Sequence, residues 1–301
     1  IMNTEGHSSD LATGAKTLSL ADQWITSIWQ KVKTSVIEHI AKYRFDLLAQ
    51  DIYEFTWDQY CDWYLEFAKS IITNKISSAA QLRGTRTTLL YILEELLRVI
   101  HPIMPFITEE IWQKIAPLTR SQNKILITAD FPNPNVDLIL PEVEITIEWI
   151  KLFITNVRNI RGEMNIAPNK VIPVILVNAS TTEQTCIDRH FAFFQPLANI
   201  ASITWLTTND PQPPAATAVI GNMKLLIPLQ GNIDKDLELA RLTKEIEKLK
   251  KELLRIKTKL ANPDYLNKAP EAIVNKEHNK LNELQLAMDK LTESLQMITD
   301  L

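Results

Sequence analysis

Residues 53–71, YEFTWDQYCDWYLEFAKSI, indicate the fold of this chain most clearly. The large apolar side chains of this stretch recur at intervals of 4, 3, 4, 3 and 4 residues: Tyr53, Trp57, Tyr60, Tyr64, Phe67 and Ile71. This spacing places them on one face of an α-helix. An aromatic face of this kind is more often the core of a helix bundle than a surface that stacks bases. We therefore predict a helix over 46–73 whose aromatic face is mostly core.

The same helix carries a row of acids at helical spacing: Asp51, Glu54, Asp58, Asp62 and Glu66. An acidic face repels RNA phosphates, so we expect these acids to pair with basic residues of neighbouring helices. The candidate partners are Arg83, Arg86 and Arg98. Any RNA contact is then expected near the ends of the helix, at Lys42, Arg44 and Lys69.

Helical patterns on both sides extend the predicted bundle over 18–169. Helices are expected at 23–42, at 81–100, from Thr108 onward and at 145–165. Near the end of the last of these, Arg158 and Arg161 share one helical face. They have two possible roles, an ion pair with acids of the bundle or a contact with RNA phosphate.

From Val171 onward the apolar residues no longer keep a continuous helical spacing, and we predict a small α/β element over 170–232. Strands are expected at 171–177, 202–206 and 223–229, with a helix over 183–197. The overall prediction is a mainly α protein with a small α/β junction.

The last segment, 233–301, contains two helices with heptad spacing. The apolar residues of the first are Leu239, Leu242, Ile246, Leu249, Leu253, Ile256 and Leu260. Those of the second are Leu281, Leu284, Met288, Leu291, Leu295 and Ile298. Because a loop containing Pro263 and Pro270 separates the two helices, we predict an antiparallel coiled-coil hairpin that forms an arm.

One face of the first arm helix carries only basic residues, spaced 3, 4, 3 and 4 apart: Arg241, Lys244, Lys248, Lys251 and Arg255. We name these five residues the basic stripe. They occupy heptad positions that point away from the apolar seam. Like charges four residues apart destabilise a helix. The stripe is therefore either an ordinary solvated face or a surface that binds an RNA backbone.

Composition excludes several classes of protein. No apolar run is long enough to span a membrane, and the net charge of -4 means that nucleic-acid binding needs local basic surfaces. The two cysteines lie far apart, as expected in a reduced cytoplasmic protein. Cys186 and His190 have a ligand-like spacing without further ligands nearby, and His101 precedes a proline at a helix end. We expect neither a metal site nor a catalytic site in this chain.

Four short motifs lie along the predicted bundle: YRF at 43–45, YEFTW at 53–57, CDWYLE at 61–66 and HPIMPFITEEIW at 101–112. They resemble the anticodon-binding bundle of class I aminoacyl-tRNA synthetases of the branched-aliphatic group. The motifs RNIRGEMNIAP at 158–168, LAN at 260–262 and KAPE at 268–271, with the predicted hairpin, narrow the resemblance to the valyl-tRNA synthetases.

The resemblance implies that the chain binds tRNA for valine. The bundle would read the middle adenine and final cytosine of the anticodon, and the arm would grip the outer corner of the tRNA. The parent enzyme would join valine to its tRNA with ATP and magnesium in the cytoplasm.

The two ATP-binding signatures of the family, His-x-Gly-His and Lys-Met-Ser-Lys-Ser, are not found in the sequence. We therefore expect a C-terminal fragment that is inactive alone, with 1–17 as a linker from a missing catalytic body that also bears the editing domain. We expect it to contact neither a membrane nor DNA. The alternative is a coiled-coil protein-interaction module without an RNA role.

Overall fold

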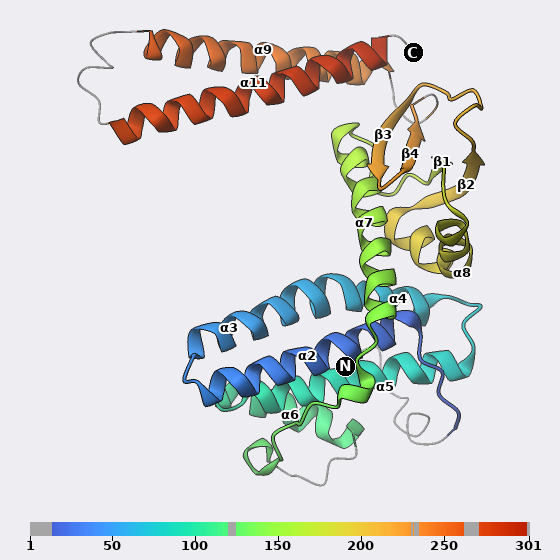
Figure 1. Ribbon diagram of the computed structural model, residues 1–301, viewed down its shortest axis with the longest axis vertical. Coiled ribbons are helices and arrows are strands. Elements are labelled where there is room, and N and C mark those ends of the chain that lie inside the picture. The colour runs from blue at the N-terminus through green and yellow to red at the C-terminus, as the bar shows by residue number, and fades with distance from the viewer. Residues whose placement is uncertain (1–13, 120–124, 230, 232–234, 262–270, 300–301) are drawn as a thin grey trace. The chain divides into compact units, whose positions relative to one another are not determined.

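The computed structural model describes residues 14–119, 125–229, 231, 235–261 and 271–299 (Figure 1). These residues form two compact units, one from 1–154 with 185–198 and the other from 155–184 with 199–301. No helix within the described ranges is both long and apolar enough to cross a membrane. The predicted segment boundaries at 17/18, 169/170 and 232/233 stay a prediction.

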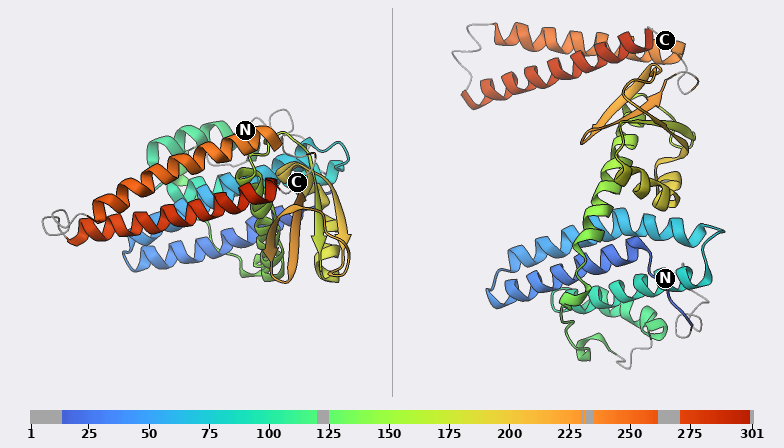
Figure 2. Two further views of the ribbon diagram at one scale, coloured as in Figure 1. Left: turned by 90° about the horizontal axis from the view of Figure 1, so that it is seen from above. Right: turned by 45° about the vertical axis from the view of Figure 1, so that its right-hand side comes forward.

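A helix bundle makes up most of the first unit. Its helices are α2 (Leu20–Ala41), α3 (Phe45–Glu54), the π-helix η1 (Phe55–Tyr64), α4 (Leu65–Thr73), α5 (Ala79–Ile100) and α6 (Pro105–Thr119). Ser19 and Ser78 begin α2 and α5 with complete capping boxes. Because α2, the run α3–η1–α4, α5 and α6 alternate in direction, the α2–α3 and α5–α6 turns lie at the same end (Figures 1 and 2).

The predicted helix over 46–73 is present as the run α3–η1–α4, but its middle is π-helical. The prediction that the aromatic face is mostly core is confirmed except at two residues, because Tyr53 is 61% and Trp57 54% exposed. Tyr60, Tyr64 and Phe67 are buried as expected. A π-helix closes its hydrogen bonds at i→i+5, so it holds more residues per turn and shifts the buried face relative to an α-helix.

Two residues of the predicted pairing, Asp51 and Arg98, have other partners. Asp51 binds Ser35 and His39 of α2, and no arginine is among its described contacts. Arg98 pairs with Glu94 and Glu95 of its own helix. The remaining acids of the row lie on the exposed face of the run: Glu54, Asp58, Asp62 and Glu66.

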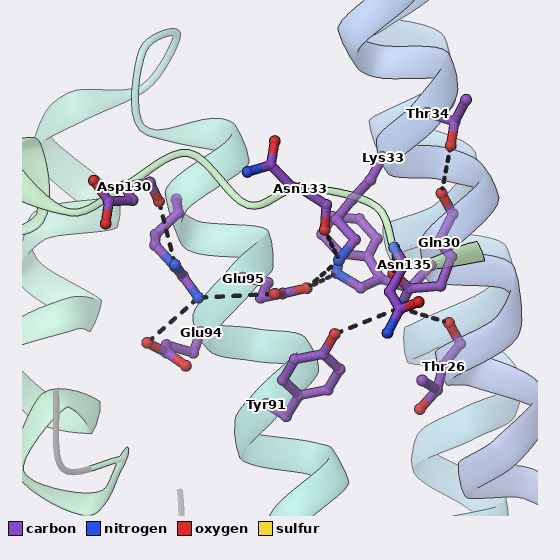
Figure 3. A network of polar contacts seen from close by, with 12 residues as sticks. Thr26, Gln30, Lys33, Thr34, Tyr91, Glu94, Glu95, Asp130, Asn133 and Asn135 are labelled. Atoms are coloured by element: carbon purple, nitrogen blue, oxygen red, sulfur yellow. Dashed lines mark hydrogen bonds and ion pairs between the residues drawn. The ribbon is translucent and has the colours of Figure 1, made fainter. Parts of the chain in front are cut away.

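A buried polar network joins α2 and α5 to the segment around Asn133 and Asn135 (Figure 3). Lys33 Nζ lies 2.8 Å from Glu95 Oε2, which also accepts a hydrogen bond of 2.7 Å from Trp29 Nε1. Lys33 donates a second bond, of 2.9 Å, to the carbonyl oxygen of Asn133. A buried ammonium needs such partners, since an unpaired charge in the core would be strongly destabilising.

Asp22 forms a second buried network at the start of α2. Its carboxylate accepts hydrogen bonds from the Ser19 backbone and hydroxyl, from Tyr64 Oη at 2.7 Å and from Thr85 Oγ1 at 2.8 Å. Burial raises the pKa of Asp22, and these donors oppose that shift. The network thereby joins α2 to η1 and α5.

Helix α7 (Pro141–Glu163) contributes residues to both units. In the first unit, the buried Lys151 lies 5.1 Å from the ring centre of Trp24 and 5.5 Å from that of Trp63. Its Nζ also donates to Gln59 Oε1 at 3.0 Å. These cation–π and polar contacts hold the first half of α7 against the bundle.

A four-stranded sheet in the second unit has the order β2-β1-β4-β3. Its strands are β1 (Ile172–Val177), β2 (Ile200–Leu206), β3 (Ala215–Ile220) and β4 (Met223–Pro228), and α8 (Thr181–Ala198) connects β1 to the parallel β2. Strand β3 is absent from the sequence prediction. Its residues are mostly small, and its antiparallel pairing with β4 supplies the order that its own pattern lacks.

The last two helices, α9 (Lys235–Leu260) and α11 (Glu271–Thr299), pack against each other. They run antiparallel: Lys235 Nζ donates to the Thr299 carbonyl oxygen at 3.0 Å, and Lys280 Nζ lies 2.8 Å from Glu252. The seam residues Leu242, Ile246, Leu253 and Ile256 of α9 are buried. The connecting loop, 262–270, lies outside the described residues, and supercoiling of the pair stays a prediction.

Candidate nucleic-acid interface

The α2–α3 turn exposes two aromatic rings beside an arginine. Tyr43 is 81% exposed and has a φ of 55°, in the left-handed region. Its ring meets that of Phe45 edge to face, with centroids 6.5 Å apart. Arg44 lies between them in sequence, and its Nε and Nη2 hold the Asp46 carboxylate at 2.8 and 2.6 Å. This arginine lowers the pKa of Asp46 to about 2.

The α5–α6 turn lies at the same end of the bundle (Figures 1 and 2), and residues in and directly after it expose further apolar side chains. Phe106 is 90% exposed, and Ile103, Met104 and Ile107 are also exposed. We define the bundle end as Tyr43, Arg44, Phe45 and Phe106. Exposed rings next to a guanidinium are the groups that bind unstacked bases of single-stranded RNA.

The structure keeps Lys42 close to this end and Lys69 away from it. Lys42 lies in the α2–α3 turn, where it forms an exposed ion pair of 3.3 Å with Glu38. An exposed pair of this kind contributes little, so RNA phosphate can readily replace it. Lys69 is exposed near the end of α4, at the opposite end of the bundle from the α2–α3 turn.

Arg158 and Arg161 differ sharply in solvent exposure although they are only three residues apart. Arg158 is exposed, whereas Arg161 is 7% exposed. Nη2 of Arg161 donates to the carbonyl oxygens of Ala167, Pro168 and Lys170 at 2.6, 3.1 and 2.6 Å. Burial lowers the pKa of Arg161. The predicted phosphate contact at Arg161 is therefore replaced by a contact with the backbone after α7.

The basic stripe on α9 presents four exposed cations: Lys244, Lys248, Lys251 and Arg255. Arg241 is half-buried and pairs with Glu245 at 3.0 Å. Glu252, next to the stripe, is bound by Lys280 of α11; this pairing, with weaker effects of Arg255 and Lys248, lowers the pKa of Glu252. The stripe thus remains strongly cationic along one exposed face of the helix.

The two histidines that drew attention in the sequence, His101 and His190, make local contacts. His101 Nδ1 lies 2.8 Å from Thr108 Oγ1, across the α5–α6 turn. His190 stacks on Phe193, and burial lowers the pKa of His190. Within the described ranges, no group of three or more histidine, cysteine, aspartate or glutamate side chains is arranged to hold a metal ion.

Sequence reasoning missed Tyr43, Phe45 and Phe106 as candidate contacts, although it selected Arg44 between the first two. Each aromatic residue lies in or next to a turn, outside the helical apolar pattern on which the core assignment depended. A large aromatic residue in a short turn between two predicted helices was the available signal.

Comparison with known protein families shows which family this chain belongs to. Residues 22–176, more than half of the chain, match the family described as the anticodon-binding domain of tRNA ligase. The chain belongs to this family. Within the tRNA-ligase family it matches the C-terminal region of valyl-tRNA synthetases, because residues 234–299 also match the family described as the valyl tRNA synthetase tRNA binding arm.

Whole-chain similarity agrees with both family matches. The chain is 41% identical over 301 residues to the valine–tRNA ligase of Legionella pneumophila strain Lens, covering 100% of this chain and 33% of that protein. The valine–tRNA ligase of strain Paris is also 41% identical with the same coverage. The chain thus spans about a third of the length of these tRNA ligases. The bundle end lies in the anticodon-binding match, and the basic stripe lies in the arm match.

Proposed function

We propose that this chain binds tRNA for valine through two surfaces, the bundle end and the basic stripe. The observation that carries the proposal is that each family match contains one exposed surface suited to RNA. Neither family describes a protein-interaction module, which favours tRNA binding over the alternative function. Specificity for valine tRNA is inferred from the valine–tRNA ligases that the chain resembles.

At the bundle end, the proposed ligand is the anticodon loop, whose bases are unpaired. Tyr43, Phe45 and Phe106 offer exposed rings for stacking, and each stacked base typically contributes about 1–3 kcal/mol. Arg44 is held in a fixed plane by Asp46, so its remaining donors can meet a base edge or a phosphate. The middle and last anticodon bases are the ones that we propose are read here.

On the arm, the proposed ligand is the sugar–phosphate backbone at the outer corner of the tRNA. We propose that α9 and α11 form a coiled coil whose buried seam leaves the stripe free to face the RNA. The stripe offers lysine and arginine side chains, which neutralise phosphates without reading bases. The arm therefore adds affinity, and the bundle end adds specificity.

The parent protein, on this proposal, joins valine to its tRNA with ATP and magnesium. We propose that both act in a catalytic part of the parent protein, which together with an editing part would lie outside the third of the valine–tRNA ligases that this chain matches. We propose the cytoplasm as its compartment, in keeping with the free thiols of Cys61 and Cys186.

The test is a binding titration with tRNA for valine and tRNA for isoleucine at fixed salt. We expect tighter binding to valine tRNA, and loss of that preference when the middle anticodon base of the valine tRNA is changed. Double-stranded DNA of equal length is the control for general charge attraction. Equal affinity for both tRNAs and DNA would show that the anticodon is not read, and no binding at all would favour the coiled-coil interaction module.

A further inference from the structure

The turn that follows α7 is held by the side chains of two residues from different parts of the second unit. Arg161 Nη2 donates to the carbonyl oxygens of Ala167, Pro168 and Lys170. Asn199 lies between α8 and β2, and its side-chain Nδ2 donates to the same Pro168 oxygen at 2.6 Å. The Asn199 carbonyl in turn accepts from the Ile172 backbone at 3.0 Å. The exit of α7 is therefore tied to the first two strands.

One further contact ties this turn to the root of the arm. Lys170 Nζ donates to the carbonyl oxygen of Gly231 at 2.7 Å. Gly231 has a φ of 74° and lies four residues before the start of α9. Arg161 and Lys170 thus form a continuous chain of hydrogen bonds from the end of α7 to the segment that leads into the arm. We name these two residues the joint.

We propose that the joint is a positioning device that restricts the movement of the arm relative to α7, so that bundle and arm engage one tRNA together. This inference rests on the proposed function, because it assumes two RNA-binding surfaces. Helix α7 begins in the unit that holds the bundle end and finishes in the unit that holds the arm. The turn at its end is consequently a place where stiffness affects both surfaces.

The joint would act through the effective concentration of the second RNA-binding surface near a tRNA that is already bound to the first. When two binding surfaces are linked, the first contact raises the local concentration of the second surface near the same ligand. A stiff connection of suitable geometry raises it further, since little conformational freedom is lost on binding. Loosening the joint should therefore weaken binding to a ligand that spans both surfaces and leave binding to a one-surface ligand unchanged.

Arginine is suited to this role and lysine is not. All three bonds come from Nη2, which the rigid guanidinium places one bond farther from the backbone than a lysine Nζ would lie, and an ammonium on a flexible stem is not held in that position. Arg161→Lys keeps the positive charge while removing the shape. It therefore separates positioning from a direct phosphate contact, which a lysine would still supply.

The experiment compares two RNA ligands on the whole chain: complete valine tRNA and an anticodon stem–loop of the same sequence. For Arg161→Lys we expect affinity for complete tRNA to fall about tenfold or more, with stem–loop affinity unchanged within about twofold. Lys170→Gln removes the exposed bond to Gly231 without disturbing a buried group. We expect it to lower the affinity for complete tRNA by a smaller factor and to leave the stem–loop affinity unchanged. Arg189→Lys, the same substitution at an exposed position of α8 outside the joint, is the matched control and should leave both affinities unchanged.

Two results would overturn the inference. Unchanged affinity of both variants for complete tRNA would show that the joint does not affect how the two surfaces cooperate. Parallel loss for tRNA and stem–loop would show a general role in folding, which thermal unfolding of each variant would reveal. If the unmodified chain binds tRNA but not the stem–loop, the proposed bundle-end function fails, and the inference built on it fails with it.

Discussion

At the scale of single residues, Trp57 and Phe67 belong to one helical run but lie in different places: Trp57 is on the surface and Phe67 is in the core. Phe67 is fully buried, with ring contacts to Trp24, Trp63 and Phe193. We expect Phe67→Ala to lower the free energy of unfolding by about 3–5 kcal/mol. Trp57→Ala should cost about 0.5 kcal/mol or less, as is usual for exposed positions. Urea denaturation of both variants measures the difference, and equal losses would contradict the exposed position of Trp57.

Asp22 predicts a pH dependence of stability. Because burial raises its pKa in the folded chain, the folded state holds this proton more tightly than the unfolded state does. Its contribution is most favourable below the unfolded pKa of about 3.9 and declines as the pH rises through the folded value. In urea denaturation from pH 4 to 7, the stability of the unmodified chain relative to Asp22→Asn should therefore fall. A relative stability that rises with pH would contradict the raised pKa.

At the scale of elements, the arm permits the sharpest electrostatic test. Lys248, Lys251 and Arg255 are exposed on α9, so replacing all three by glutamine should leave the packing with α11 intact. If they bind RNA phosphates, the slope of log affinity against log salt should decrease by about 0.7–0.9 for each phosphate that is no longer neutralised. Binding of cognate and non-cognate tRNA should weaken about equally.

Glutamine at Lys250, Lys257 and Lys276, three exposed arm lysines outside the stripe, provides a control with the same change in charge. Helicity measured by circular dichroism should stay unchanged in both triple variants. A salt slope that is the same for stripe and control variants would mean that the stripe is an ordinary solvated face.

At the scale of the whole molecule, we expect no chemistry from this chain alone. Neither ATP-binding signature of the tRNA-ligase family occurs in its sequence. The chain should therefore neither exchange pyrophosphate with ATP in the presence of valine nor attach valine to tRNA. A full-length valine–tRNA ligase from Legionella pneumophila is the positive control. Valine-dependent exchange clearly above a buffer background would refute this expectation.

Features that depend on neighbours along the chain could be predicted from the sequence alone. The capping boxes at Ser19 and Ser78 need only residues three positions apart, and the heptads of α9 and α11 need only the helical period. The end of α5 at Ile100 is expected beside Pro102, but His101 keeps helical φ and ψ of -52° and -42°, so the extended conformation expected before a proline is not what ends the helix. The family resemblance, carried by short contiguous motifs, was visible at the same level.

The directions of individual side chains, by contrast, depend on tertiary contacts. The π-helical turn of η1 exposes Trp57, and the pattern of apolar residues assumes an α-helix throughout, so it assigns this residue to the core. Arg161 turns inward because three carbonyl oxygens, six to nine residues along the chain, converge on its guanidinium. Strand β3 depends on its pairing with β4. In each case contacts made only in the folded chain outweigh the local preference that a sequence pattern can express.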